Sequence, residues 1–558
     1  MKKQGLGTRR WGLAVTGWPR RVPQGASHKV AQGFSLAIVV ALLPIALAGQ
    51  SATIAQPAGS TVDAIFAKWT SSTPGCVVGV ATGGKPVLAK GYGMADLEHD
   101  VRLSPDSILE PGSVAKQFTA AAVLLLARDG KLSLDDQARK YIPELPDYGE
   151  PLTIRHMLNH TSGLRDWGNV AGIAGWPRTT RVHTHAHVLE IVARQKALNF
   201  TPGTHWSYSN TGFNLAAIIV QRVSGMPFAE FTRTRLFEPL GMTHTSWRDD
   251  YTRLVKGRAL AYAERDGAFH TDMPFENVYG NGGLLTTVGD LLTWNEHYDA
   301  PSAADAAMTA EQQKPGHFND GRALGYAFGL FVGTYKGLHE VYHSGSTAGY
   351  SAFLTRFPDQ KVAVAVMCNA ATANATQYAH AVADLYLGDR VKPAAPPPTL
   401  TAAELDAAAG LYRSLLTGVA VTIGRDKDTM RGRKWTFDGH GGAVAGDESA
   451  AVSSSMTPER YERVPPASYT DEQLAALAGT YVSDEAETVL TAVVENHTLA
   501  LKRRPDVTIK LTPTYADAFT ADHGLGTVIF RPAADGRPSG FSVVQDRVWN
   551  MRFVRTPK

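Results

Sequence analysis

The fold of this chain is narrowed first by the order in which β-rich and helix-rich segments follow one another. The first β-rich stretch, residues 76–93, is interrupted by Gly83-Gly84, a pattern that predicts a hairpin. An apolar stretch at helical spacing, residues 115–129, then opens a helix-rich middle. Three more β-rich runs come late, at 341–346, 350–357 and 362–367. This order predicts an α/β (α+β) domain over residues 60–390, with one antiparallel sheet completed by both ends and flanked by helices.

A second domain is indicated by a proline-rich stretch and by a repeat that follows it. Prolines crowd the linker predicted over residues 391–402. Residues 403–558 are β-rich, and their repeated segments are 409–414 with 478–483, the helical leads 402–408 with 471–477, and the ends 461–464 with 552–555. The repeat predicts an antiparallel β-barrel closed from two half-units, or else two small β-modules.

The amino-terminal segment has the features of an export signal. Residues 1–33 carry seven basic side chains and no acidic one, and an apolar run ends in Ala46-Leu47-Ala48. This pattern predicts a secretory signal over residues 1–48 and a periplasmic or secreted protein, with an uncleaved anchor as the alternative. Removing the seven charges takes the formal net charge from +3 to −4, so the composition does not imply a nucleic-acid partner.

Ser113 and Lys116 form the first candidate catalytic pair. The sequence Ser113-Val114-Ala115-Lys116 stands at the start of the apolar helix, and a spacing of three residues places both side chains on one helical face. A serine hydroxyl attacks a carbonyl well only when a neighbouring base takes its proton. A partly desolvated lysine supplies such a base because burial lowers its pKa. Taken alone, this four-residue pattern is common.

Two later motifs add candidate residues. Tyr208-Ser209-Asn210 offers a phenol to share the base role and an amide to bind a substrate carbonyl; the alternative is a packing tyrosine beside a helix cap. His343-Ser344-Gly345-Ser346 lies on a predicted strand, where Gly345 lets a substrate approach the backbone. The backbone N–H groups of Ser113 and Ser346 would then form an oxyanion hole.

The three motifs in this order resemble the serine β-lactamase and penicillin-binding-protein family, nearest to its class C branch. Flanking segments that also resemble the family are 158–164, 200–203, 282–284 and 286–291. The resemblance spans residues 60–390 and implies the β-lactamase/transpeptidase-like fold with a helical subdomain. Several family members carry C-terminal barrels, which implies a lipocalin-like barrel over residues 403–558.

The same resemblance implies a role for each motif residue. Ser113 would be the acylated nucleophile, Lys116 and Tyr208 the proton-transfer pair, and Asn210 the group that orients the substrate amide. His343 takes the basic position of the third motif, where β-lactamases usually have lysine. A histidine of ordinary pKa is mostly neutral at pH 7, which weakens the anchoring of a substrate carboxylate. We therefore expect an esterase, D-aminopeptidase or peptidase, with a β-lactamase, a DD-carboxypeptidase or a non-turnover sensor as alternatives.

The remaining expectations concern cysteines, metals and partners. In the family fold the first strand lies beside the last, so the resemblance implies that Cys76 and Cys368 face each other, either as a disulfide or as two buried thiols. The cluster His183-Thr184-His185-Ala186-His187 leads into a helix predicted over 188–197 with Thr184 as its cap, so no metal site and no cofactor are expected. A small-molecule or peptide substrate is expected. The barrel would either limit substrate size or mediate contacts in a homo-oligomer.

Overall fold

The computed structural model describes residues 59–392, 401–426, 429–430, 434–437, 442–446, 459–533 and 537–557. Residues Ala55–Lys558 form one compact unit. The predicted signal segment, 1–48, and the proline run, 393–398, lie outside the described residues. None of the described helices is long and apolar enough to cross a membrane.

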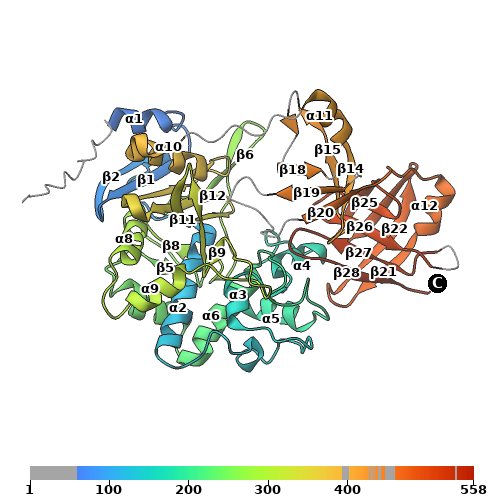
Figure 1. Ribbon diagram of the computed structural model, residues 1–558, viewed down its shortest axis with the longest axis horizontal. Helices are drawn as coiled ribbons and strands as arrows, with labels where there is room; N and C mark the ends of the chain where they lie inside the picture. Colours follow the sequence, from blue (N-terminus) through green and yellow to red (C-terminus); the bar gives the residue numbers. More distant parts are fainter. Residues whose placement is uncertain are drawn as a thin grey trace, which may run out of the picture. The chain divides into compact units, whose positions relative to one another are not determined.

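A seven-stranded antiparallel sheet organises the first half of the chain, in the order β2-β1-β13-β12-β11-β10-β9 (Figure 1). Its strands are β1 (Cys76–Thr82), β2 (Lys85–Tyr92), β9 (Tyr326–Ala327), β10 (Leu330–Tyr335), β11 (Leu338–Thr347), β12 (Tyr350–Phe357) and β13 (Val362–Cys368). The predicted hairpin and the three late strands are confirmed. Strand β1 pairs with β13, so both ends of the segment complete one sheet.

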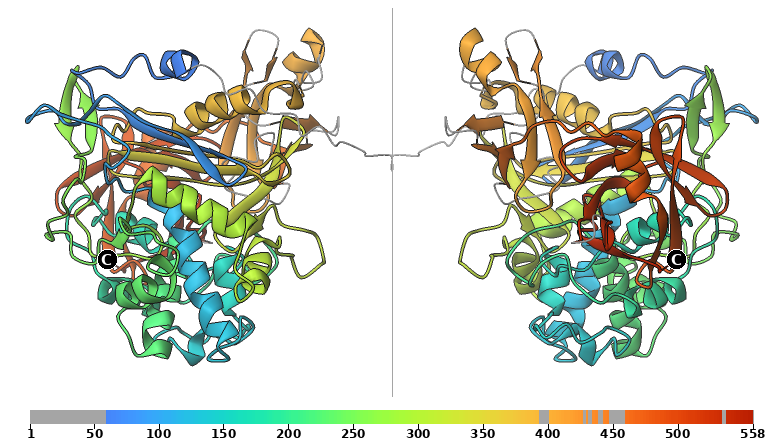
Figure 2. Two further views of the ribbon diagram at one scale, coloured as in Figure 1. Left: turned by 90° about the vertical axis from the view of Figure 1, so that its left-hand side faces the viewer. Right: turned by 90° about the vertical axis from the view of Figure 1, so that its right-hand side faces the viewer.

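Helices fill the middle of this domain and cover the sheet. The α-helices are α1 (Gly59–Ile65), α2 (Lys116–Arg128), α3 (Ile154–Leu158), α4 (Trp167–Ile173), α5 (His185–Ala193), α6 (Asn210–Ser224), α7 (Phe228–Thr232), α8 (Val288–Asp299), α9 (Ala306–Gln313) and α10 (Ala375–Leu387). Short paired strands join them: β3 (Met94–Asp96), β4 (Val101–Arg102), β5 (Ser246–Trp247), β6 (Tyr262–Arg265), β7 (Ala268–Thr271) and β8 (Leu284–Leu285). Figure 2 shows α1 and α10 on one side of the sheet and α8 on the other.

Alternation along the strands explains why both faces of the sheet are buried. Val78 and Val80 of β1 belong to one apolar cluster with Val382 of α10. Gly79 between them points to the opposite face, where a Cβ would lie 3.0 Å from Leu292 Cδ1 of α8. Successive side chains of a strand point to opposite faces, so a strand apolar throughout is buried on both.

The second half of the chain holds two separate β structures, so the prediction of one barrel closed from two half-units is wrong and the alternative of two β-modules holds. Strands β21–β28 close into an eight-stranded antiparallel barrel: β21 (Gly479–Ser483), β22 (Thr488–Glu495), β23 (Thr498–Arg503), β24 (Val507–Pro513), β25 (Ala518–Ala521), β26 (Gly526–Arg531), β27 (Gly540–Val544) and β28 (Met551–Arg555). Before it come β14 (Gly410–Ser414), β15 (Ala420–Ile423), β16 (Arg425–Asp426), β17 (Thr429–Met430), β18 (Lys434–Phe437), β19 (Gly442–Gly446) and β20 (Glu459–Arg463). Five of these pair in the order β15-β14-β20-β19-β18, and β16 pairs with β17.

The internal repeat is visible in the structure. Helices α11 (Ala402–Ala408) and α12 (Asp471–Leu477) have the predicted bounds and precede β14 and β21. Tyr412 Oη donates to Ala408 O at 3.0 Å, and Tyr481 Oη donates to Leu477 O at 2.7 Å. At the other end, Arg463 pairs with Tyr412 and Arg555 with Tyr481. Arg463 therefore corresponds to Arg555, which shifts the predicted match of 461–464 with 552–555 by one residue.

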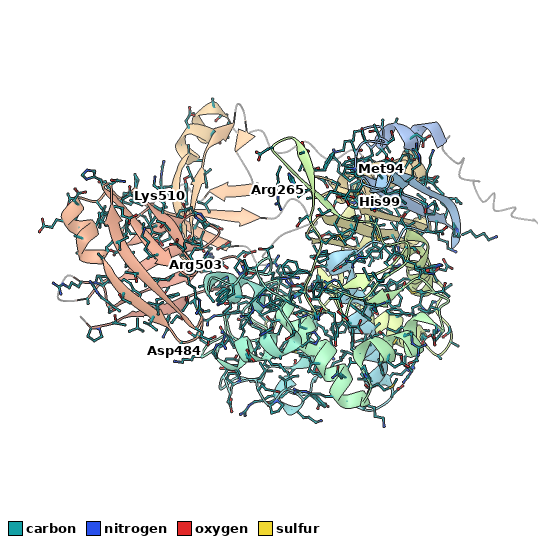
Figure 3. The ribbon with its side chains drawn as sticks, turned by 180° about the vertical axis from the view of Figure 1, so that it is seen from behind. Met94, His99, Arg265, Asp484, Arg503 and Lys510 are labelled. Carbon is teal, nitrogen blue, oxygen red and sulfur yellow. A yellow bond between two sulfur atoms is a disulfide. The ribbon has the colours of Figure 1, made fainter. Side chains whose placement is uncertain are left out.

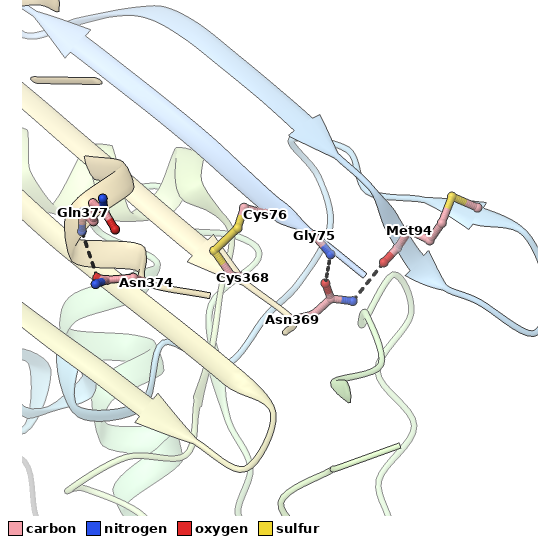
Figure 4. Close-up of a disulfide and its surroundings, with 7 residues drawn as sticks. All are labelled: Gly75, Cys76, Met94, Cys368, Asn369, Asn374 and Gln377. Atoms are coloured by element: carbon pink, nitrogen blue, oxygen red, sulfur yellow. Dashed lines mark hydrogen bonds between the residues drawn. A yellow bond between two sulfur atoms is a disulfide. The ribbon is translucent and has the colours of Figure 1, made fainter. Parts of the chain in front are cut away.

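The two cysteines lie opposite each other on the paired first and last strands. Cys76 and Cys368 are register partners of β1 and β13, and a disulfide joins them (Figure 4). Next to the bond, Asn369 Oδ1 accepts from Gly75 N at 2.7 Å, and Asn369 Nδ2 donates to Met94 O at 2.9 Å. The side-chain amide therefore connects the end of β13 to the backbone at both ends of the hairpin.

Polar contacts join the barrel to the first domain. Arg165 Nη1 lies 2.6 Å from Glu485 Oε1, and both side chains are buried. Arg503 of β23, labelled in Figure 3, donates through Nη1 to Gly172 O of α4 at 2.8 Å. Asn199 Nδ2 donates to Arg547 O at 3.0 Å. The loop between β27 and β28, residues 545–550, is thereby attached to the first domain.

Candidate active site

Ser113 and Lys116 lie together at the start of α2. A 3₁₀ turn, Gly112–Ala115, precedes the helix, and Gly112 has a φ of +53°, a left-handed conformation that favours glycine. Ser113 is half-buried and Lys116 is fully buried. Lys116 Nζ lies 3.1 Å from Ser113 Oγ. The structure therefore shows these two side chains paired as predicted. Helix α2 begins at Lys116, one residue after the predicted start at residue 115.

The surroundings of Lys116 are polar, and no carboxylate of the described residues lies within hydrogen-bonding distance of its amine. Its Nζ donates to Asn210 Oδ1 at 2.8 Å and to Asn281 O at 2.7 Å. Burial lowers the pKa of Lys116 well below its ordinary value, and the nearby charge of Arg547 lowers it further. These surroundings favour the uncharged form of the amine.

The second motif places a phenol and an amide around the same amine. The Tyr208 ring centre lies 4.8 Å from Lys116 Nζ. Burial raises the pKa of Tyr208, while a hydrogen bond with Ser113 and the charge of Arg547 oppose that shift. Asn210 is the first residue of α6, with Ser209 at the cap position. Its backbone N–H donates to Asp166 Oδ2 at 2.7 Å, which fixes the start of the helix.

The third motif lies on β11, where its backbone closely approaches the nucleophile. A Cβ on Gly345 would lie 2.0 Å from Pro111 O and 2.6 Å from Ser113 N. A Cβ on Gly112 would lie 2.6 Å from Ser346 N. Both glycines are needed for this approach, which brings the backbone of β11 near Ser346 against the backbone of the nucleophile turn near Ser113.

His343 occupies a different environment from that of a surface cation. Its Nε2 lies 3.1 Å from Tyr326 Oη, and its Nδ1 lies 2.5 Å from Ser344 O. The carbonyl requires the proton on Nδ1, so Nε2 accepts from the phenol. Burial, with a smaller effect from the charge of Lys116, lowers the pKa of His343 to about 3. His343 is therefore neutral over a wider pH range than a histidine of ordinary pKa.

The same phenol reaches a second buried histidine. His160 Nε2 lies 3.2 Å from Tyr326 Oη, and His160 Nδ1 accepts from Ser209 N at 3.1 Å. These hydrogen bonds can all donate in one direction: Ser209 N–H to His160, His160 to the Tyr326 hydroxyl, and that hydroxyl to His343. The second and third motifs are therefore connected by neutral hydrogen bonds beneath the site.

Several site residues were not found by sequence reasoning. Glu110 lines the cavity and is fully buried against Arg248, with Nε–Oε2 at 2.9 Å and Nη2–Oε1 at 3.0 Å. Glu110 also accepts from Gly283 N at 3.1 Å, which links the nucleophile turn to the strand segment near Asn281. Asn281 and His160 stand in or beside segments that resemble the family, and that was the available signal for both.

A cavity of about 740 Å³ opens beside these groups. Its lining includes the predicted residues Ser113, Tyr208, Asn210, His343, Gly345 and Ser346. Lys116 lies beneath the lining. Two further lining residues, Asp546 and Arg547, come from the barrel loop. The structure thus brings all seven predicted catalytic and substrate-binding residues to one place and adds a contribution from the second domain.

The histidine cluster is dispersed among separate contacts. Helix α5 begins at His185 and ends at Ala193, so it starts three residues before and ends four residues before the predicted bounds. The early start has its reason in a capping box, in which Thr184 caps the helix and His187 reaches back to the Thr184 backbone. His185 Nε2 lies 3.0 Å from Tyr279 O. His183 is buried behind these groups.

The family model described as Beta-lactamase matches residues 61–387. Penicillin-binding protein 4* of Bacillus subtilis is 28% identical over 305 residues, which cover 52% of this chain and 66% of that protein. A D-aminopeptidase of Gluconobacter oxydans is 28% identical over 300 residues, which cover 53% of this chain and 56% of that protein. The matched region thus spans less than two thirds of the length of these relatives.

Solved structures resemble this chain in fold, and one of them does so over most of its length. The octameric penicillin-binding protein homologue from Pyrococcus abyssi has a TM-score of 0.52 at 21% identity and covers 89% of this chain and 98% of its own. The D-amino acid amidase from Ochrobactrum anthropi SV3 has a TM-score of 0.50 at 21% identity and covers 59% of this chain and 98% of its own. The predicted fold class, a mixed sheet-and-helix domain followed by an antiparallel barrel, is confirmed.

Proposed function

We propose that this chain, which belongs to the beta-lactamase family, cleaves ester or amide bonds through an acyl-enzyme formed on Ser113. The chain is a serine hydrolase of that family. Esterase, D-aminopeptidase and related peptidase activities are the finer form of the proposal. The observation that carries it is the buried amine of Lys116, which lies 3.1 Å from Ser113 Oγ and has no carboxylate from the described part of the chain within hydrogen-bonding distance.

The hydrogen bonds of the Lys116 amine leave it able to accept the proton of Ser113. An uncharged amine has two N–H groups and one lone pair. The two N–H groups are used by Asn210 Oδ1 and Asn281 O. The lone pair is left facing Ser113 Oγ, where it accepts the hydroxyl proton as the oxygen attacks a carbonyl. Tyr208 is held neutral by burial and so can carry a proton between the amine and the leaving group.

Charge that develops on the substrate carbonyl needs donors already in position. The backbone nitrogens of Ser113 and Ser346 lie where the two glycines let the strand and the turn approach each other, and their N–H groups would bind that oxyanion. Asn210 stands beside the nucleophile to orient the substrate amide. Water then releases the acyl group and restores Ser113. No step requires a metal or an organic cofactor.

Penicillin turnover and DD-carboxypeptidase activity are the second candidate. The likeness to a protein named penicillin-binding protein 4* favours it. The neutral, buried His343 stands against it, because that position then supplies no charge for a substrate carboxylate. A non-turnover sensor is a third form, and it would leave a persistent acyl-enzyme.

The test is hydrolysis of a 4-nitrophenyl ester of a short acid by the wild-type protein and by Ser113→Ala. Ser72→Ala, an exposed serine in a turn, is the matched control. Loss of turnover in Ser113→Ala alone, with an acyl adduct mapped to the wild-type Ser113 peptide, would support the proposal. Equal turnover in all three proteins would refute it. A panel of D-amino-acid amides, peptides and β-lactams then ranks the finer candidates.

We also propose export to the periplasm or the medium, on the pattern of residues 1–48. Amino-terminal sequencing of the protein recovered from cell fractions tests this. A homo-oligomer remains a prediction, and light scattering on the purified chain measures it.

A further inference from the structure

The third motif of this site does not supply a fixed positive charge. His343 is buried, and both its ring nitrogens are engaged by Tyr326 and the Ser344 carbonyl. Lys116 lies beneath the cavity lining with its amine directed to neutral oxygens. Arg178 lines the cavity but is paired with the buried carboxylate of Glu276. Each of these three cationic residues is therefore either uncharged or already paired.

The barrel places one more cation at the same cavity. The loop of residues 545–550 is held by backbone contacts: Asp166 N donates to Arg547 O at 3.2 Å, and Asn199 Nδ2 donates to the same oxygen at 3.0 Å. Asn199 Oδ1 accepts from Trp549 N at 2.8 Å. The carbonyl of Arg547 and the N–H of Trp549 are both hydrogen-bonded to the first domain. The Arg547 side chain therefore starts from a defined position at the cavity wall.

The guanidinium of Arg547 points at the catalytic motifs. Its Cζ lies 4.8 Å from the centre of the Tyr208 ring, and its side chain is 34% exposed. Its Nε is buried and, among the described residues, makes no hydrogen bond; it forms an ion pair with Asp546, at 3.3 Å from Oδ2, and the Asp546 side chain is 52% exposed. Among the described residues, no protein hydrogen bond engages either Nη atom. A forked donor with free N–H groups that faces a cavity matches the geometry of a carboxylate.

We propose that Arg547 binds an anionic group of the substrate, a carboxylate, and so supplies from the barrel the charge that the third motif lacks. The proposal rests on the hydrolase function of Ser113 and narrows its substrate class to carboxylate-bearing esters and amides. The barrel is then part of the substrate-binding site. The position of Arg547 above Tyr208 places the bound carboxylate close to the bond that is cleaved.

The test compares ester pairs that differ only in one carboxylate. On the leaving-group side, 3-acetoxybenzoate is paired with its methyl ester; on the acyl side, 4-nitrophenyl hydrogen adipate is paired with 4-nitrophenyl methyl adipate. The readout is the ratio of kcat/KM for the charged ester to that for the neutral ester. A ratio cancels losses that arise from folding or from altered packing on Tyr208. The pair that responds identifies which side of the scissile bond carries the anion.

Arg547→Ala is expected to lower this ratio by about 10- to 100-fold in one pair, the effect of a lost charge-assisted hydrogen-bonded pair. Arg547→Lys keeps the charge but not the fork and should recover part of the loss. Arg552→Ala, an exposed arginine on β28, is the matched control and should keep the wild-type ratio. Ratios within twofold of wild type for both pairs in Arg547→Ala would overturn the proposal. Failure of the Ser113 mechanism is seen separately, as neutral-ester turnover that is absent in wild type or persists in Ser113→Ala.

Discussion

The buried imidazole of His343 should make the folded protein lose stability on mild acidification. In the unfolded chain a histidine titrates near 6.5, whereas in the folded protein the pKa of His343 is about 3. Between these values the unfolded chain binds the proton and the folded protein does not, so the free energy of unfolding falls as pH falls. For these two values the loss between pH 8 and pH 5 is about 2 kcal/mol.

The measurement is urea unfolding at pH 8 and pH 5, followed by tryptophan fluorescence, for wild type and His343→Gln. Glutamine does not titrate, and its amide oxygen can still accept from Tyr326. Whatever its stability at pH 8, this variant should lose about 2 kcal/mol less than wild type between the two pH values. The exposed His270→Gln is the matched control. Equal losses in wild type and His343→Gln, within about 0.5 kcal/mol, would show that His343 is not held neutral as the structure implies.

Four further predictions follow from the geometry. Gly345→Ala should lower kcat/KM on a neutral ester by about 100-fold, because its Cβ would meet Pro111 O and Ser113 N. Gly172→Ala, which has open space at its Cβ, is the control and should keep the wild-type value. Equal kcat/KM for the two variants would contradict the role of the close approach at Gly345. The rise of kcat/KM with pH that reports Lys116 losing its proton should lie well below 10.5, and a rise only above pH 10 would mean that its pKa is not lowered. Replacing both Cys76 and Cys368 by alanine should cost about 2–4 kcal/mol in urea unfolding, and an unchanged midpoint would mean that the bond does not constrain the unfolded chain. Arg165→Ala should cost about 3–5 kcal/mol by leaving Glu485 buried without its partner, and Arg165→Met with Glu485→Leu should cost less; the reverse order would contradict the argument.

Local patterns in the sequence were sufficient where the relevant contacts are local. A spacing of three residues placed Ser113 and Lys116 on one face, and turn residues at Gly83-Gly84 placed the hairpin. Helices α11 and α12 begin where their threonine caps stand, so their predicted bounds are those of the structure. Helix α5 begins earlier than the sequence predicts because the capping box brings His187 into the first turn, and a histidine in that role gives a weak signal in the sequence.

Contacts between distant segments could not be read from the sequence. Lys116 donates to the carbonyl of Asn281, and a backbone oxygen carries no residue-specific signal. Tyr326 bridges His160 and His343, yet nothing around Tyr326 distinguishes it from a packing tyrosine. The sequence alone therefore predicts an ordinary pKa for His343, because burial depends on residues that are brought together only by the fold.

The repeat in the second half shows why equivalent folding does not give equivalent function. Both units open with a capped helix and a tyrosine that donates back to it, and both close with an arginine, Arg463 or Arg555, packed over a glycine at the first strand. These shared contacts explain why the sequences remain alike at those positions. The loop that carries Arg547 lies between β27 and β28, immediately before the strand that ends in Arg555. Its anchors include Asp166 and Asn199 of the first domain, and its Asp546 and Arg547 line the cavity. A unit can therefore keep the pattern of the repeat and still line the cavity through a loop, residues 545–550, that lies outside the repeated segments.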